Sequence, residues 1–197
     1  MTLTPLSPRF EKALVYAAHL HRNQKRKGTE IPYVSHLLAV AAIVLENGGN
    51  EDEAIAALLH DAAEDQGGRP KLDDIRAQFG ARVADIVEAC SDALDEDPAN
   101  KPEWRPRKER YHQRLRASRD PSAYLVSAAD KLHNASATLA DSFAAKGAVW
   151  GRFNGGRDGT RWNYAELIAI YGAGPRDVRR DSILRQLKLV VEQLESR

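Results

Sequence analysis

The stretch AIAALLHDAAEDQGG, residues 54–68, begins as an apolar helix and ends in a cluster of acidic residues. Residues three or four positions apart share a helix face, so Asp61 faces Glu64 and Asp65. Three carboxylates beside an Ala- and Leu-rich surface repel one another and lose solvation when they are buried. We therefore expect a metal ion, a basic side chain or ordered water to hold this cluster together.

The helical pattern of this stretch extends along almost the whole chain. Apolar residues recur every three or four positions, and Gly or Pro separates the periodic segments. No segment shows the alternation that is typical of a strand. The sequence therefore predicts an all-α fold, with one helical-bundle domain over residues 1–197. The expected helices span residues 7–21, 35–47, 51–65, 72–80, 81–93, 107–117, 121–143, 164–173 and 179–196, and the longer loops span 24–33, 94–106 and 151–162.

Composition excludes several classes of protein. The 197 residues are 43% hydrophobic, which supplies a substantial core, and the net charge of +1 does not favour nucleic acid. The first residues lack a leader pattern, and no apolar run is long enough to span a bilayer. The single cysteine, Cys90, is expected to be a buried structural thiol. We expect a cytoplasmic protein with no membrane or nucleic-acid partner, and composition predicts no oligomeric state.

Four residues on three apolar segments are candidate metal ligands. Two imidazoles and two carboxylates form a nitrogen and oxygen set that suits Mn²⁺, Fe or Zn²⁺ and leaves positions open for water or phosphate. Neighbouring helix residues diverge by about 100°, yet side chains as different in length as those of His and Asp can still converge on one ion. The candidate ligands are His36, His60, Asp61 and Asp130.

Each of these residues also has an ordinary explanation. His36 at the start of a helix is often a cap or a solvated residue, and Asp130 has Arg26 or Lys131 as possible ion-pair partners. A bare His-Asp dipeptide occurs by chance in many proteins. The combination is more informative, because every acid on an apolar helix needs a compensating charge and one metal ion serves them all.

Three segments that contain these residues resemble the HD metal-dependent phosphohydrolases. PYVSH, ALLHDAAED and SAADKLHN match that family in order and spacing. HRNQKRKGTEIPYVSH further resembles the Gln-x-Arg-Lys…Pro-Tyr-x-x-His signature of the hydrolase domain of RelA/SpoT alarmone enzymes. The resemblance covers about residues 10–171, so we expect no alarmone synthetase domain. The length is similar to that of the stand-alone small alarmone hydrolases, which include metazoan SpoT homologues.

The resemblance implies a role for each matching residue. One metal ion, commonly Mn²⁺, would be bound by the four candidate ligands. Glu64 and Asp65 match the pair that positions and activates the attacking water, and a carboxylate one turn beyond Asp61 is placed to accept its proton. Arg26 and Lys27 match residues that flank the base, and Asn134 matches a residue that contacts the nucleoside.

A substrate with a 3′-pyrophosphate brings several negative charges close to these carboxylates, so further cations must hold its phosphates. The loop over 94–106 and the helix after it contain several basic residues, and we expect this loop to close over the substrate. The Gly-rich region near residue 160 contains others. The candidates are Lys101, Arg105, Arg107, Lys108 and Arg157, and we place Arg161 and Tyr164 in the phosphate pocket.

The implied reaction converts ppGpp to GDP and pppGpp to GTP, with release of pyrophosphate. It would lower alarmone levels, either to end a stringent response or to neutralise a toxic synthetase. Gln66 stands where many relatives have Thr, and ASATL follows Asn134 in place of the usual Met-Arg-Thr-Leu. Because both departures affect the nucleoside region, adenosine counterparts such as ppApp are further expected substrates.

Three alternatives remain open at this point. The first is another HD enzyme, such as a 5′-nucleotidase or an NADPH phosphatase, although QKRK before PYVSH favours the alarmone branch. The second is a non-catalytic alarmone sensor, which would not need the Glu64–Asp65 pair. A nucleic-acid-binding module fits less well, because the basic segments carry no recognition-helix motif.

Overall fold

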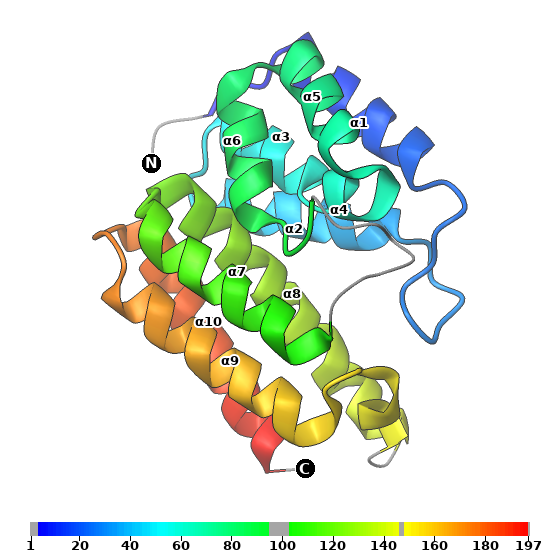
Figure 1. Ribbon diagram of the computed structural model, residues 1–197, viewed down its shortest axis with the longest axis vertical. Coiled ribbons are helices and arrows are strands. Elements are labelled where there is room, and N and C mark those ends of the chain that lie inside the picture. Colours follow the sequence, from blue (N-terminus) through cyan, green and yellow to red (C-terminus); the bar gives the residue numbers. More distant parts are fainter. Residues whose placement is uncertain (1–3, 95–102, 146–147, 197) are drawn as a thin grey trace.

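Helix α8 (Pro121–Ala145) runs through the middle of the computed structural model and packs against α2, α3, α6, α7, α9 and α10 (Figure 1). The structure describes residues 4–94, 103–145 and 148–196. The other helices are α1 (Pro8–Leu20), α2 (Val34–Glu46), α3 (Glu51–Leu59), α4 (Ala62–Gln66), α5 (Gly68–Phe79), α6 (Ala81–Cys90), α7 (Trp104–Ser118), the 3₁₀ helix η2 (Ala148–Arg152), α9 (Gly156–Ala173) and α10 (Val178–Glu195). The expected all-α fold is confirmed.

Helix α3 is the most deeply buried element. Every residue from Ala54 to Leu59 has no exposed surface, as is typical of a helix that is apolar on all sides. Buried side chains contributed by helices from α1 to α10 join it in one continuous core. Among the described ranges, no helix combines the length and the apolar surface that crossing a membrane requires. Lys25 and Pro32 form an isolated antiparallel bridge, and the described residues contain no strand.

The helix expected over 51–65 is in fact two helices. Helix α3 ends at Leu59, and α4 begins at Ala62. Between them lie His60 and Asp61. Both stay in the right-handed helical region, but the Asp61 backbone (φ −95°, ψ −6°) departs from ideal helix values. This departure falls at the two neighbouring residues whose side chains approach each other.

The expectation of a loop over 151–162 is also wrong, because the 3₁₀ helix η2 ends at Arg152 and α9 begins at Gly156. Its glycines allow close packing against an aromatic ring. A Cβ atom on Gly155 would lie 2.7–2.9 Å from the Trp104 ring, and one on Gly159 would come within 3.0 Å of it. Glycine is therefore needed here for its small size, which sequence alone cannot distinguish from loop flexibility.

Two other boundaries differ from expectation. Helix α5 begins at Gly68 and includes Pro70, because a proline in the first turn of a helix loses no hydrogen bond. Helix α7 begins at Trp104, so the end of the loop expected over 94–106 is helical. Residues 95–102 of that loop, including Lys101, lie outside the described part of the chain, and its closure over substrate stays a prediction.

Glu53 connects three helices through one buried carboxylate. It forms a capping box with Asn50, whose backbone N–H donates to Glu53 Oε2 at 2.7 Å. The Ser122 hydroxyl, on α8, donates to Oε1 at 2.7 Å. Arg179 Nη1, on α10, lies 2.8 Å from Oε2. Both oxygens are thus hydrogen-bonded, which compensates for the loss of water at a side chain that is only 1% exposed.

We expect Glu53→Ala to lower the free energy of unfolding by about 3 kcal/mol, because it removes one partner of a buried ion pair. Urea denaturation measures this change. Glu109→Ala, which breaks the exposed pair between Arg105 and Glu109, is the control and should change stability by less than about 0.5 kcal/mol. Equal effects of the two substitutions would contradict the structural role of Glu53.

Candidate metal centre and adjoining cavities

Three helical segments bring two histidines and an aspartate together at the centre of the molecule. His36 lies in the first turn of α2, His60 follows the last residue of α3, and Asp130 lies midway along α8. All three are buried, and one potential ligand atom of each lies within 4.8 Å of the others. Residues that are far apart in the sequence therefore form one cluster.

Asp61 completes the predicted set of four. Its Oδ2 lies 3.0 Å from His60 Nε2 and 3.6 Å from His36 Nε2. Asp130 Oδ1 lies 3.2 Å from His36 Nε2 and 3.7 Å from His60 Nε2. Two imidazole nitrogens and two carboxylate oxygens thus face one another across a space of a few ångströms.

The Nδ1 atoms of the two histidines face away from this space. His60 Nδ1 lies 2.8 Å from the carbonyl oxygen of Ala57, which can only accept, so Nδ1 carries the proton. His36 Nδ1 lies 2.7 Å from Nδ1 of His133. If His36 likewise carries its proton on Nδ1, His133 is the acceptor.

Both Nε2 atoms are buried and make no hydrogen bond within the described part of the chain. A neutral imidazole whose Nδ1–H is occupied presents a lone pair at Nε2, which is the atom that binds metals. The carboxylates of Asp61 and Asp130 supply hard oxygen ligands beside them. By this test the side chains fit a divalent cation, and the structure contains a possible His/Asp metal site.

The ionisation of the cluster also favours a cation. Burial disfavours charge here, yet Asp61 and Asp130 together raise the pKa of His60 well above its ordinary value. Against the same burial, His60 holds the pKa of Asp61 well below its usual range, and Lys131 does the same for Asp130. The two carboxylates therefore remain charged and favour positive charge at His60 Nε2, which a bound cation would supply in place of a proton.

Neighbouring side chains orient the two carboxylates. The Tyr33 hydroxyl donates to Asp61 Oδ2, and Asn134 Nδ2 donates to Asp130 Oδ1. Lys131 Nζ pairs with the other oxygen of Asp130, which is one of the pairings considered from sequence. Hydrogen bonds to metal-binding carboxylates fix their direction and so define the shape of the site.

Glu64 and Asp65 lie just beyond the cluster, in α4, and have different surroundings. Glu64 accepts a hydrogen bond from the backbone N–H of Asp92 at 3.0 Å and another from Arg107 Nη1 at 3.1 Å. Asp65 is more exposed, and Gln24 Nε2 donates to its Oδ2 at 2.8 Å. One carboxylate is held by cationic and backbone donors, and the other faces solvent.

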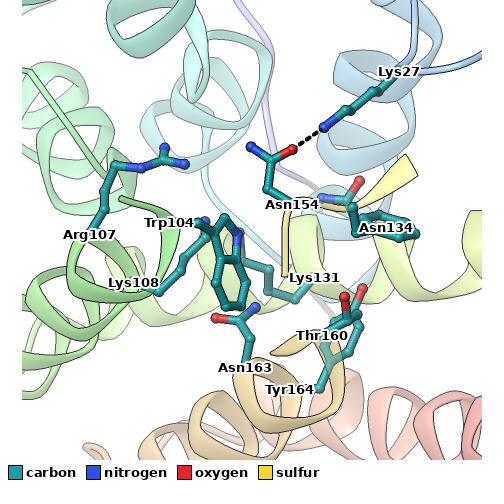
Figure 2. A pocket seen from close by; sticks show the side chains of 11 residues that line it. Lys27, Trp104, Arg107, Lys108, Lys131, Asn134, Asn154, Thr160, Asn163 and Tyr164 are labelled. Atoms are coloured by element: carbon teal, nitrogen blue, oxygen red, sulfur yellow. Dashed lines mark hydrogen bonds between the residues drawn. The ribbon is translucent and has the colours of Figure 1, made fainter. Parts of the chain in front are cut away.

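A cavity of about 290 Å³ adjoins the cluster and is strongly basic. Figure 2 shows Lys27 on one side, Arg107 and Lys108 on another, and Lys131 below, with Trp104 between them. Lys27 Nζ donates to Asn154 at 2.7 Å across the cavity (Figure 2). We call this space the basic cavity; its full lining is Lys27, Trp104, Arg107, Lys108, Lys131, Asn134, Phe153, Asn154, Thr160, Asn163 and Tyr164.

A second cavity of about 380 Å³ lies beside the basic cavity. Lys27, Asn134 and Phe153 line both. Ile31, Ala137 and Ala140 make much of this second wall apolar, and we call the space the apolar slot. Arg26 also lines the slot, and its Nη2 donates to Asn134 at 2.9 Å. Because Asn134 in turn bonds Asp130, the slot is directly connected to the candidate metal ligands.

The structure brings most of the predicted site residues together. The four candidate ligands, the Glu64–Asp65 pair, Arg26, Lys27 and Asn134 surround one region, and the buried Tyr164 lines the basic cavity. Arg161 does not join them. Its side chain is 46% exposed, lies 3.5 Å from Glu195 of α10 and lines neither cavity. The expected pocket position of Arg161 is therefore incorrect.

The other basic candidates divide in the same way. Arg107 and Lys108 line the basic cavity, whereas Arg105 stacks on the Trp162 ring, 3.4 Å from its centroid, and Arg157 bonds the backbone of Glu195. Sequence reasoning missed His133 as a neighbour of His36. Its spacing was the available signal, because a residue three positions after Asp130 lies on the same helix face.

The chain is similar in sequence to proteins of known family. Residues 13–158 match the family model described as HD domain. The mouse guanosine-3′,5′-bis(diphosphate) 3′-pyrophosphohydrolase MESH1 is 38% identical over 126 residues, which cover 62% of this chain and 65% of the mouse protein. The human protein of that name is 36% identical over the same shares. The matched segment is thus less than two thirds of the length of these relatives.

Similarity also extends to a solved structure and a longer enzyme. A solved structure of a metazoan orthologue of SpoT that hydrolyses ppGpp superimposes with a TM-score of 0.72 and 27% identity, over 93% of this chain and 97% of that one. A GTP pyrophosphokinase from Streptomyces antibioticus is 36% identical over 126 residues, which are only 14% of its length.

We expect His133→Phe to weaken divalent-metal binding about 10- to 100-fold, because the ring remains but the acceptor for His36 Nδ1–H is lost. Calorimetric titration of EDTA-treated protein with Mn²⁺ measures the affinity. His19→Phe, at an exposed position of α1, is the control and should bind as wild type. An unchanged affinity in His133→Phe would show that this contact does not orient the ligand.

Proposed function

This chain belongs to the HD domain family, and from that premise we propose that it is a metal-dependent hydrolase of the 3′-pyrophosphate of guanosine alarmones. It would convert ppGpp to GDP and pyrophosphate, and pppGpp to GTP and pyrophosphate. The observation that carries the proposal is the position of two unpartnered buried Nε2 atoms and two carboxylates beside a cavity lined by four cationic side chains. The relatives MESH1 are named for this reaction, which supports the choice of substrate.

In this proposal His36, His60, Asp61 and Asp130 hold one divalent ion. Mn²⁺ suits a set of two nitrogens and two carboxylates of intermediate hardness. When bound, such an ion supplies Lewis-acid polarisation of a phosphoryl oxygen and lowers the pKa of water. Tyr33 and Asn134 keep the two carboxylates directed at the ion through the hydrogen bonds described above.

Glu64 and Asp65 act on the attacking water. Both carboxylates lie one turn beyond Asp61, within α4, and a carboxylate at this position can accept a proton from water as it attacks phosphorus. Arg107 and the Asp92 N–H hold Glu64 in one orientation, and Gln24 holds Asp65. The 3′ oxygen of the ribose departs as the pyrophosphate is released.

The two cavities bind different parts of the substrate in this proposal. The basic cavity suits the phosphates, because Lys27, Arg107, Lys108 and Lys131 neutralise several negative charges that would otherwise repel the acidic cluster. The apolar slot suits the nucleoside, with Arg26 beside the base and Asn134 between the base and the metal site. Adenosine alarmones such as ppApp share every feature except the base, and they belong to the same proposal as weaker substrates.

We expect pyrophosphate release from ppGpp in the presence of Mn²⁺, and no release in EDTA or from Asp61→Ala. Glu64→Gln should retain Mn²⁺ binding while its kcat falls by about 10²- to 10⁴-fold, the usual contribution of a general base. Pyrophosphate assay and metal titration of the same samples separate the two roles. Release that persists in EDTA would contradict the metal requirement, and failure on ppGpp with activity on 5′-monophosphates or NADPH would indicate another HD phosphohydrolase.

Lys27→Ala should raise the KM for ppGpp about 10-fold with a smaller effect on kcat, because it removes a charge-assisted contact to phosphate. Steady-state kinetics measure both constants. Lys25→Ala is the matched control, because Lys25 lies two positions away in the same loop and pairs with the exposed Glu30. Equal effects of the two substitutions would mean that only general positive charge, and not the cavity, binds the substrate.

A further inference from the structure

We propose that the ion pair between Asp141 and Arg152 reads the nucleobase of the substrate and selects guanine over adenine. The pair lies in the apolar slot and involves neither a metal ligand nor a residue of the sequence motifs. The inference rests on the proposed alarmone hydrolysis for the class of ligand, and it adds the group that distinguishes one base from another.

The position of Asp141 follows from the geometry of α8. It lies eleven residues after Asp130, which is about three turns or about 16 Å along the helix. Asp130, Asn134 and Asp141 therefore lie along one face, at spacings of four and seven residues. This face of α8 carries the candidate metal ligand Asp130, then Asn134, which we propose contacts the nucleoside, and then the Asp141 carboxylate.

The Arg152 side chain is held against Asp141 by close packing on the backbone of Gly28. Gly28 has a φ of +72°, and a Cβ atom there would lie 3.0–3.3 Å from the Arg152 side chain. The Arg152 side chain therefore packs directly over the glycine of the basic loop, and its Nη1 pairs with Asp141 Oδ2. This packing limits the directions available to the guanidinium, which favours a defined reading geometry.

The pair presents the hydrogen-bonding pattern that guanine requires. Its carboxylate accepts from the base, and the other N–H groups of its guanidinium donate to the base. Guanine offers N–H donors at positions 1 and 2 next to the O6 acceptor, whereas adenine offers a donor at position 6 and an acceptor at position 1. A guanine whose O6 faces Arg152 satisfies both partners, and an adenine in that place opposes both.

The remaining walls of the slot suit a purine ring. Ile31, Ala137, Ala140 and the Phe153 ring provide apolar surface, and aromatic rings stack on any base without distinguishing it. Discrimination between guanine and adenine must therefore come from the polar end of the slot, at Asp141 and Arg152. The Asp141 and Arg152 side chains are 38% and 28% exposed, so they remain reachable by a ligand that enters the slot.

The test compares Asp141→Asn with wild type on ppGpp, on its inosine counterpart without the 2-amino group, and on ppApp. We expect the kcat/KM of wild type to decrease in that order. In Asp141→Asn, the value for ppGpp should fall about 10- to 100-fold, because a hydrogen bond to a charged acceptor is lost. The value for ppApp should not fall, so the preference for guanine shrinks. Arg152→Gln should also reduce the preference for ppGpp over ppApp. It provides a second test if Asp141→Asn does not fold.

Glu166→Gln is the matched control. Glu166 pairs with Arg116 at a similar exposure, 37%, and lines neither cavity. This substitution should leave all three values unchanged. An equal guanine preference in wild type, Asp141→Asn and Arg152→Gln would overturn the inference.

Calorimetric binding of GDP, IDP and ADP separates this inference from the proposed function. If wild type hydrolyses no alarmone but binds GDP more tightly than ADP, and Asp141→Asn removes that difference, the base-reading role stands while the reaction is wrong. If alarmones are hydrolysed and neither kinetics nor binding depends on Asp141, the reaction stands and the base-reading role fails.

Discussion

The structure depends on two ionised carboxylates, the buried Asp130 and the partly buried Asp61, at the point where α2, α3 and α8 meet. Removing a charged carboxylate from water is costly unless opposite charge and hydrogen bonds replace the solvent. Here Asp61 accepts a hydrogen bond from the Tyr33 hydroxyl. Asp130 accepts one from Asn134 and forms an ion pair with Lys131. A cation bound between these carboxylates and the two histidine Nε2 atoms would complete the neutralisation. The fold can tolerate this cluster only if all these elements assemble together, so the site and the core are specified jointly.

The break between α3 and α4 is the local consequence of that constraint. An uninterrupted helix would separate the His60 and Asp61 side chains by about 100°. At the break the Asp61 backbone departs from ideal helix values, and its Oδ2 lies 3.0 Å from His60 Nε2. The buried surface of α3 holds the break in position, because none of its last six residues is exposed. A rigid apolar helix thus positions two polar side chains that would be disordered on a loop.

Acidic side chains hold Arg107 and Lys108 of the basic cavity in place. Asp92 accepts from Lys108 at 2.6 Å and from Arg107 at 3.2 Å, and Arg107 also contacts Glu64. Such pairing keeps the cations ordered at low entropic cost, so that a polyanion meets positions that are already formed. It also couples the phosphate-binding side to the carboxylate that we propose as the general base. The packing of Trp104 on two glycines of the α9 region places α7 close enough for this contact.

The helical class and the four candidate ligands could be predicted from the sequence, and the structure brings these ligands, His36, His60, Asp61 and Asp130, into one cluster. Both follow from local periodicity and from the cost of placing charge on an apolar helix, which are properties of short segments. Four other features could not be predicted from the sequence and depend on tertiary packing: the break at His60–Asp61, the contact of His133 with His36, the outward position of Arg161 and the pairing of Asp141 with Arg152. Each of these depends on which faces of separate helices meet. That choice is made by packing over the whole core, because helical spacing shows which residues share a face but not which neighbour the face will meet.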